Sequence, residues 1–391
     1  MSIARVLASP TLKLGVIGFL VLLLLIPMAL VDGLRAEREQ RRDAVAAEIA
    51  ASVGGAQTLL APVVRVPFVE PIRDAKGVVV GETESAWLFA PRRVKIAGAL
   101  ALEQRARGIF SVPVYVATHD IEGGFSFDEA AVRAIPGTPD LARAELLVPV
   151  SAARALRRIE LAVDGTAREL ATGTHQLAGY GAFSTPLPGF RFDAPLPFRL
   201  TLAASGAEAI EFVPLAGDTE VRLDAPWPHP AFHGGFLPAT RKIGDAGFAA
   251  DWQVLSFNRE IPAYWLASSD LERVFSANQF GVRLVQPIDI YFLNHRSAKY
   301  GFLFLVLTFG AFFLFETIGR SRMHAIQYLL VGAALAVFYL VLLATSEHLG
   351  FALSYLLAAG SMGVMIAAYA WAVMQSLKRA LVIGSWLATL Y

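Results

Sequence analysis

Hydrophobic positions along this chain are gathered into long uncharged runs near its two ends. The first run, Leu14–Val31, has 18 residues without a charge. A helix of that length spans about 27 Å, close to the hydrocarbon thickness of a bilayer. Signal-peptide cores are shorter, about 7–15 residues, and precede a small-residue cleavage site. Here Asp32 and a charged stretch follow, so the pattern predicts an uncleaved anchor helix that includes Pro27, which membrane helices tolerate.

The last 92 residues hold six charged side chains and no proline, and they predict a helical membrane bundle. Three runs are long enough to cross: 300–319, which carries one charge, then 325–345 and 350–374. The apolar segment 380–391 has only 12 residues, too few to span as a helix. We therefore expect an incomplete fifth span, as if the sequence were cut off inside it.

The short loops predict the orientation. Arg320 and Arg322 lie between the second and third spans, and Lys378 and Arg379 follow the fourth, whereas the loop between the third and fourth spans has neither lysine nor arginine. The positive-inside rule then places the basic loops and the N-terminus in the cytoplasm and residues 32–299 outside. Four arginines between positions 35 and 42 favour the opposite orientation, but long domains translocate largely regardless of charge.

Residues 32–299 hold 19 of the 21 prolines and most of the charge. A charged helix to about Ala51 is expected to continue from the anchor, and after Gly54 the pattern becomes that of strands, most clearly where Phe198, Leu200 and Leu202 alternate with polar residues. Other expected elements are strands at 59–69, 109–117, 159–163, 220–223 and 248–257 and helices at 127–134 and 151–157. Short strands with turn signals predict a sandwich-like domain.

These patterns predict a polytopic α-helical membrane protein with a large, mainly β, sandwich-like α+β domain outside the cytoplasm. Its expected parts are residues 1–31, with a cytoplasmic N-terminus and the transmembrane anchor at 14–31, then the outer domain at 32–299, and the C-terminal membrane bundle at 300–391.

Composition narrows the function classes. Only 17% of the 391 residues are charged, 55% are hydrophobic, and the net charge is +1. Soluble domains carry about a quarter charged residues, so this balance excludes a disordered or nucleic-acid-coating protein and disfavours a soluble enzyme. The absence of cysteine excludes disulfides, thiolate metal sites and cysteine nucleophiles. With no phosphate loop, nucleophile elbow or metalloprotease motif, we expect no catalytic residues, no cofactor, no metal and no nucleic-acid partner.

Three candidate functional residues lie at the ends of the spans. Glu316 is an intramembrane carboxylate, which is a functional candidate by default. Its position four residues before Arg320 favours a plain snorkelling pair. Glu347 and His348 form either a proton-sensing or partner-binding pair or solvated loop residues. A hydrolase using Ser346 with these two is disfavoured, because adjacent residues do not readily converge as a triad does.

Trp227 and His229 are candidates in the outer domain. His229 and His233 have the i, i+4 spacing of two metal ligands on a helix, but Pro228 and Pro230 exclude a helix there. The segment is therefore predicted to be a proline-set loop that packs Trp227 against the domain. On the fourth span, Ala359, Gly363 and Ala367 form a small-residue stripe, and Gly332 with Ala336 repeats the spacing on the third. Such stripes allow helices to approach closely.

Several strings resemble the CreD family of inner-membrane proteins, also called cell envelope integrity or colicin-tolerance inner-membrane proteins. They occur in family order from the first span to the end of the chain. The strings are Ser52–Leu59 with Ala61 and Pro62, Trp227–Pro230 with Gly235–Pro238, Phe312–Thr317, Gln327–Gly332 and Ser346–His348.

The resemblance implies an inner-membrane protein of the Gram-negative type, with one N-terminal span, a large periplasmic domain and a C-terminal bundle. The family usually has two further crossings where this chain has half of one. It is tied to envelope integrity and to the envelope-stress or β-lactam response, and it has no established enzymatic activity. We therefore expect a non-enzymatic protein that acts through its periplasmic β domain. The expected partners are the lipid bilayer together with periplasmic or cell-wall components or other inner-membrane proteins. The alternative is a transporter or accessory permease subunit that uses the helical bundle.

Overall fold

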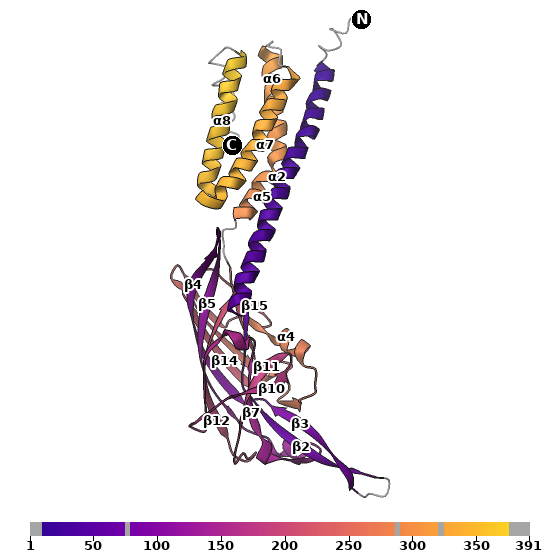
Figure 1. Ribbon diagram of the computed structural model, residues 1–391, viewed down its shortest axis with the longest axis vertical. Helices are drawn as coiled ribbons and strands as arrows, with labels where there is room; N and C mark the ends of the chain where they lie inside the picture. The colour runs from indigo at the N-terminus through magenta and orange to yellow at the C-terminus, as the bar shows by residue number, and fades with distance from the viewer. Residues whose placement is uncertain (1–9, 75–78, 286–289, 320–323, 375–391) are drawn as a thin grey trace. The chain divides into compact units, whose positions relative to one another are not determined.

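The computed structural model describes residues 10–74, 79–285, 290–319 and 324–374, and the chain divides into two compact units (Figure 1). The helical unit comprises Met1–Ala44 and Ile288–Tyr391, and the β unit comprises Val45–Pro287. The expected fold class, membrane helices joined to a large mainly β domain, is confirmed. The expected limits of the outer domain, residues 32 and 299, describe where the chain leaves and re-enters the membrane, and they stay a prediction.

Among the described residues, five helices contribute to the helical unit and two lie in the β unit. The helical unit has α2 (Pro10–Val53), of which the part up to Ala44 belongs to this unit, α5 (Ile290–Lys299), α6 (Gly301–Gly319), α7 (Ala325–Leu349) and α8 (Phe351–Met374). The β unit has α3 (Glu129–Arg133) and α4 (Glu272–Asn278).

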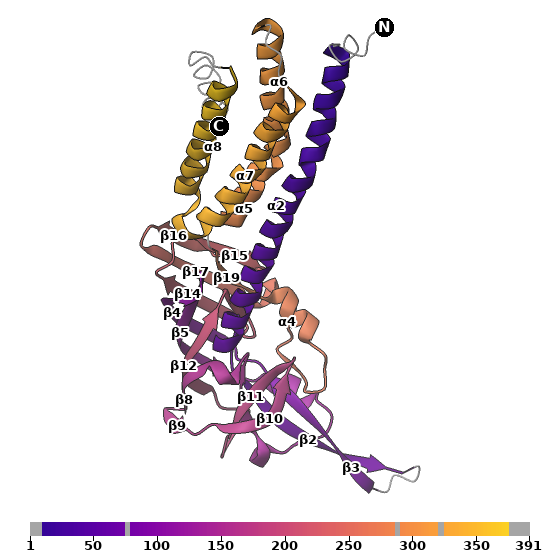
Figure 2. The same cartoon turned by 45° about the horizontal axis from the view of Figure 1, so that its top comes forward.

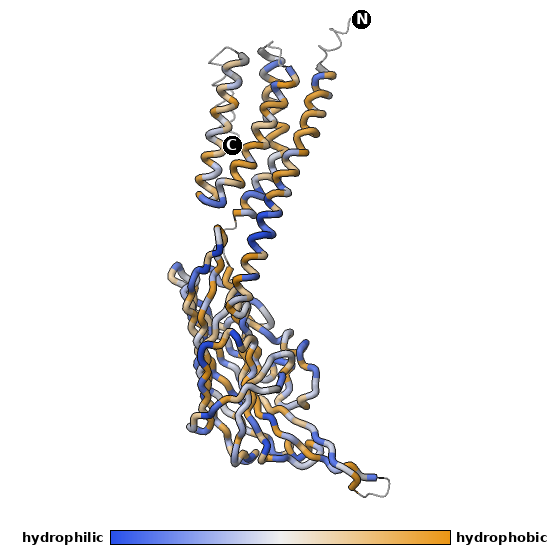
Figure 3. Tube along the Cα trace, viewed as in Figure 1, coloured by the Kyte–Doolittle hydropathy of each residue, from blue (hydrophilic) through white to orange (hydrophobic). Residues whose placement is uncertain are grey.

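Four helical stretches of the described residues are long and apolar enough to cross a membrane: Thr11–Val53, Ile290–Leu314, Ala325–Leu349 and Phe351–Tyr369. They coincide with the four complete runs expected from hydropathy, and Figure 3 shows α2 changing from hydrophobic to hydrophilic beyond its apolar run. The second span begins earlier than expected, because α5 precedes α6 with only Tyr300 between them. The expected incomplete span at 380–391 lies outside the described residues.

Side chains from α2, α6, α7 and α8 share one apolar core, which includes Leu24, Phe309, Leu335, Leu342 and Met362. Large apolar side chains also cover the outer faces of these helices, among them Phe19, Leu22, Leu356 and Val364. Hydrocarbon is as apolar as leucine, so a helix surface in a bilayer has no need of polar residues. The surface of the helical unit is therefore suited to lipid.

The last turns of α2 belong to the β unit. Ile49, Ala50 and Val53 pack against Val112, Val114 and Ala207 of the strands. The helix ends at Val53, two residues beyond the expected end near Ala51, and two glycines follow it. Gly54 and Gly55 have φ of 103° and 68°, a left-handed conformation that glycine adopts without a Cβ penalty, and the Gly55 amide closes the helix on the Ala50 carbonyl at 2.7 Å.

Two mixed sheets form the β unit. In the first, of eleven strands among the described residues, the order is β15-β19-β13-β1-β7-β2-β3-β18, with β6, β10 and β11 paired at its side. Its strands are β1 (Gln57–Leu60), β2 (Val63–Arg73), β3 (Val79–Phe89), β6 (Thr138–Pro139), β7 (Glu145–Val150), β10 (Ala171–Leu177), β11 (Tyr180–Pro186), β13 (Ala209–Val213), β15 (Pro230–Gly234), β18 (Tyr264–Leu266) and β19 (Phe280–Leu284).

The second sheet has eight strands in the described residues, in the order β16-β17-β14-β4-β5-β12-β8-β9, which Figure 2 shows side by side. They are β4 (Arg93–Arg107), β5 (Phe110–Phe125), β8 (Leu156–Val163), β9 (Thr166–Arg168), β12 (Leu196–Ala207), β14 (Asp218–Ala225), β16 (Thr240–Gly244) and β17 (Gly247–Leu255). The pairs β1–β13 and β4–β14 are parallel.

Alternating side chains place the core between the two sheets. In β4, Val94, Ile96 and Leu100 are buried while their neighbours are exposed, as a strand with one solvated face requires. Phe212 of the first sheet and Trp252 of the second meet in this core, with ring centroids 6.3 Å apart. The predicted alternation at 198, 200 and 202 is confirmed in β12.

Two local expectations were wrong. The expected strand at 59–69 is two strands, because the chain breaks at Ala61 and Pro62 and the two parts lie on opposite sides of β7, β1 between β13 and β7 and β2 between β7 and β3. Proline has no amide hydrogen for a ladder and disfavours a continuous strand. The expected helix at 151–157 is only a 3-10 turn, Ala153–Ala155, leading into β8.

Candidate functional site

The carboxylate of Glu316 is buried inside the helical unit, with 8% of the residue exposed. Lys13 near the start of α2 forms an ion pair with it, and the hydroxyl of Tyr328 at the start of α7 donates a hydrogen bond to it over 3.1 Å. Glu316 thus joins α6 to two other helices. The snorkelling partner expected from the sequence, Arg320, lies outside the described residues.

At the opposite ends of the helices, Glu347 belongs to α7 and accepts a hydrogen bond from the Tyr291 hydroxyl at 3.0 Å. Ser346 is buried, accepts from the Asn294 amide at 2.8 Å and donates to the Leu343 carbonyl at 3.0 Å. His348 is exposed in the last turn. Consecutive side chains on a helix point about 100° apart, and these three residues reach different surroundings, so they do not meet as a triad.

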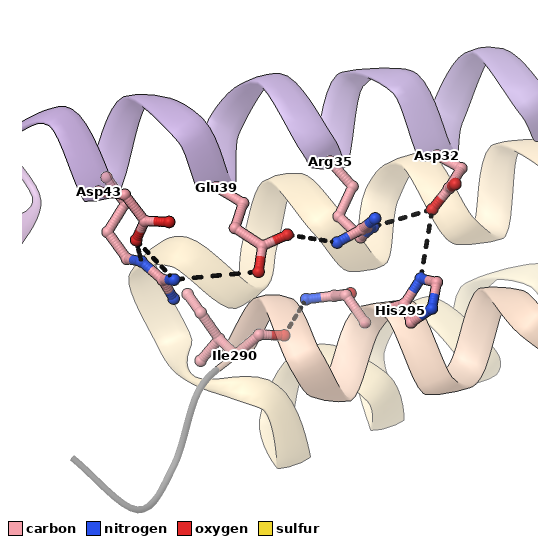
Figure 4. Close-up of polar contacts among 8 residues, drawn as sticks. Asp32, Arg35, Glu39, Asp43, Ile290 and His295 are labelled. Atoms are coloured by element: carbon pink, nitrogen blue, oxygen red, sulfur yellow. Dashed lines mark hydrogen bonds and ion pairs between the residues drawn. The ribbon is translucent and has the colours of Figure 1, made fainter. Parts of the chain in front are cut away.

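A line of alternating charges follows the apolar run of α2 (Figure 4). Arg35 donates to Asp32 at 2.8 Å and to Glu39 at 2.6 Å, and Asp32 also lies 3.5 Å from the ring of His295 on α5. Arg42 donates to Asp43 at 2.9 Å and stacks its guanidinium over the Tyr291 ring, 5.3 Å from the centroid. Asp32 and Arg35 are three positions apart and Arg35 and Glu39 are four apart, the spacings at which side chains on one helix meet.

Sequence reasoning missed Lys13, Tyr291, Asn294 and His295 as partners of these sites. Each is a polar or amphipathic residue near the end of an apolar run, and this position could have indicated that it contacts a polar residue on a neighbouring helix. Tyr328 lies between the helices, where its hydroxyl is satisfied by the hydrogen bond to Glu316.

The two small-residue stripes differ in their surroundings. A Cβ on Gly332 would collide with Leu24 and crowd Phe309 and Leu305, so the close approach expected at this glycine is confirmed. A Cβ on Gly363 would meet nothing within 4 Å, and Ala359 and Ala367 are half-buried. In the described residues the buried line of α8 is instead Ser354, Ala358, Met362 and Ile366. Packing at 359, 363 and 367 stays a prediction.

In the β unit, Trp227 fastens the proline-rich loop. Its indole N–H lies 3.2 Å from both the His229 and the Val285 carbonyl oxygens, and its ring packs on the main core. The loop leads into strand β15, so His229 and His233 do not share a helix. His229 is exposed, whereas His233 lies 3.0 Å from the Glu211 carboxylate.

A cavity of about 580 Å³ opens on the β unit, within the 300–1,000 Å³ range typical of ligand pockets. We call it the β-unit cavity. It lies where the ends of β3, β5, β14 and β18 meet α3. Aromatic side chains and charged groups from these segments line it, among them Phe89, Phe127, Tyr264 and Arg259. The sequence did not indicate this cavity, because its wall combines segments up to 175 positions apart, from Phe89 to Tyr264.

Two comparisons with known proteins, one with family models and one with curated sequences, agree on one family. The family model described as inner membrane protein CreD matches residues 9–391. Inner membrane protein CreD of Escherichia coli (strain K12) is 32% identical over 367 residues, which is 91% of this chain and 79% of that protein. Among solved structures, yeast LTA4 hydrolase in complex with bestatin shows 8% identity over 52% of this chain and 30% of its own, with a TM-score of 0.21, too low to indicate a shared fold. The family match and the membrane-length helices support a location in the inner membrane. This chain belongs to the CreD family of inner membrane proteins.

Proposed function

We propose that the protein supports cell-envelope integrity and the envelope-stress or β-lactam response, without enzymatic activity, by binding a periplasmic or cell-wall component through its β unit. The observation that carries this proposal is the β-unit cavity, which is large enough for a ligand and lined by aromatic and charged side chains. The aromatic rings and arginines of this lining, such as Phe127, Tyr264 and Arg259, are groups that bind apolar and anionic parts of a ligand.

The helical unit supports a periplasmic position for the β unit. Lys13, Glu316 and Tyr328 mark one end of the unit, and Asp32, His295 and Glu347 mark the other. The chain passes to the β unit after Ala44, shortly beyond Asp32, and returns from it before Ile288, shortly ahead of His295. Both connections are therefore close in sequence to residues of the second set. The basic loop at 320–322 follows Glu316 at the first end, the end that the positive-inside rule assigns to the cytoplasm.

Photo-crosslinking in intact cells tests the proposal. Benzoylphenylalanine would replace Ser126, which is exposed at the β-unit cavity, and in a matched strain Ala167, which is exposed on β9 away from it. We expect an adduct with an envelope component from position 126 and none from 167. Equal adducts from both positions, or none from either, would contradict the proposal.

A transporter or accessory permease subunit is the second candidate, because Glu316 is a buried intramembrane carboxylate. Such residues mark ion and proton pathways in many membrane proteins. Its pairing with Lys13 gives it a structural role as well. If Glu316→Gln leaves the envelope phenotype unchanged in a folded protein, the proton-coupled form of this candidate is lost.

A further inference from the structure

Arg259 is a buried cation in the wall of the β-unit cavity. Only 9% of the residue is exposed. Its Nε donates to the Ala216 carbonyl at 2.8 Å, and its Nη1 donates to the Ile261 carbonyl. No carboxylate of the described residues forms an ion pair with it, and burial lowers the pKa of its guanidinium. Because a buried charge without a counter-ion is costly, this site favours an anion.

The formal charges of the cavity wall balance, with two arginines, Arg92 and Arg259, and two aspartates, Asp128 and Asp218. Arg92 is exposed and has no ion pair within the described part of the chain. The two aspartates of the wall are engaged already: Asp128 accepts a hydrogen bond from the Ala130 amide at 2.9 Å, and Asp218 lies 3.5 Å from Arg93. The arginines are thus the groups left to bind a ligand.

The rings beside Arg259 supply an apolar wall. Phe89 stacks with Tyr264 at a centroid distance of 6.0 Å and meets Phe127 edge-on at 5.6 Å. Phe127 and Tyr264 are half-buried at the cavity. Ring faces of this kind bind apolar or aromatic groups, so the cavity combines an anion site with an apolar wall.

We propose that the β-unit cavity binds a monocarboxylate attached to an apolar or aromatic group, with the carboxylate at Arg259 and the apolar group against Phe127 and Tyr264. Main-chain carbonyls already occupy Nε and one Nη1 hydrogen, while Nη2 has no hydrogen-bond partner in the described residues. The donors that remain suit a planar carboxylate. A phosphate dianion needs more donors, and the nearby Asp128 and Asp218 would repel it more strongly. This inference rests on the proposed binding role of the β unit.

Two sources share this chemistry, a small organic acid and the C-terminus of a peptide, and the experiment separates them. Calorimetric titration of the full-length protein in lipid nanodiscs would use N-acetylphenylalanine, its C-terminal amide, phenyl phosphate, and a pentapeptide that ends in a free phenylalanine. We expect the acid to bind at least about tenfold more tightly than the amide or the phosphate, since charge-assisted hydrogen bonds are lost with the amide. Tighter binding of N-acetylphenylalanine would identify a small organic acid as the ligand, and tighter binding of the pentapeptide would identify the C-terminus of a peptide.

Substitutions locate the binding. Arg259→Gln should weaken binding of the acid at least about tenfold, and Ala131→Phe, on the α3 side of the cavity, should block it. Arg259→Gln also removes hydrogen bonds to the main chain and could therefore prevent folding. In that case Ala131→Phe, which leaves these hydrogen bonds in place, still tests whether the ligand binds in the cavity. Arg92→Gln should weaken binding a fewfold. Arg158→Gln, at an exposed position of β8 outside the lining, should not.

Equal affinity for acid and amide, tightest binding of the phosphate, unchanged affinity in Ala131→Phe, or no binding of any probe at millimolar concentration would overturn the inference. Each of these results leaves the crosslinking from position 126 unaffected, so failure of the ligand chemistry is distinguishable from failure of the proposed function.

Discussion

Lys13 and Glu316 form an ion pair across 303 positions of sequence, and it joins the start of α2 to the end of α6. With Tyr328 as a third member, it ties the anchor helix to the C-terminal bundle. The anchor is therefore part of the helical unit and not an independent tether.

The charges of Lys13 and Glu316 should depend on each other for their contribution to stability, so removing one of them leaves the other charge without a partner. Lys13→Met or Glu316→Gln should each lower the free energy of unfolding by about 1–3 kcal/mol, because a buried partner loses its counter-charge. The double variant should lose less than the sum of the two. Denaturant unfolding in detergent micelles, analysed as a double-mutant cycle, measures the coupling.

The control for that cycle is the exposed pair Glu129 and Arg133 on α3. Surface pairs contribute about 0–1 kcal/mol, so its coupling should be smaller. Equal coupling in the two pairs would contradict a structural role for Lys13 and Glu316.

Gly332 and Gly363 offer a matched test of helix packing. Gly332→Ala should lower the free energy of unfolding by about 1–3 kcal/mol, because its Cβ would press on Leu24 and Phe309. Gly363→Ala should be neutral or stabilising by up to about 1 kcal/mol, since alanine is the better helix former. Thermal unfolding of both variants checks the order, and a larger loss at Gly363 would mean that its stripe packs against something else.

His119 gives the β unit a pH-dependent stability. Burial lowers its pKa from the ordinary 6.5 to about 4, against a smaller opposite effect of Asp120. Between these two values the unfolded chain binds a proton that the folded chain does not, so stability falls as pH decreases from 6.5 to about 4, by about 3 kcal/mol in all. Below pH 4 this contribution changes no further.

Melting temperatures of the β unit in the full-length protein, taken from pH 8 to 4, measure this effect. His119→Leu should flatten the decline, whereas His229→Leu, at an exposed position, should leave it unchanged. The same decline in His119→Leu and in the unmodified protein would assign the effect to other groups.

Trp227 is expected to stabilise its loop while His229 is not. Trp227→Phe removes the donor shared by the carbonyl groups of His229 and Val285, at a cost of about 1–2 kcal/mol in the free energy of unfolding. His229→Ala should stay within about 0.5 kcal/mol, as exposed substitutions usually do. Urea unfolding followed by tryptophan fluorescence distinguishes the two, and a larger loss in His229→Ala would point to a contact of that imidazole.

The membrane helices and the β class could be predicted because both depend on local patterns: uncharged runs for the spans and alternation at Phe198, Leu200 and Leu202 for the strands. Partners could not. Arg320 is close to Glu316 in sequence and Lys13 is far from it, and only packing brings Lys13 to the carboxylate.

Sheet order and the cavity escaped prediction for the same reason. The parallel pairing of β1 with β13 joins segments about 150 positions apart, and nothing local to either strand specifies that neighbour. Arg259 reads as an ordinary charged loop residue in the sequence. Its burial without a carboxylate results from the carbonyl groups of Ala216 and Ile261 that surround it.

The most direct test of the account is the side of the membrane on which the β unit lies. The absence of native cysteine allows single cysteines at Ala130, exposed on α3, and at Ser321, in the basic loop between the second and third spans. Intact spheroplasts would be treated with a membrane-impermeant maleimide. The account predicts labelling at 130 and not at 321, with both labelled after lysis. Labelling at 321 and not at 130 would place the β unit in the cytoplasm and contradict an envelope partner.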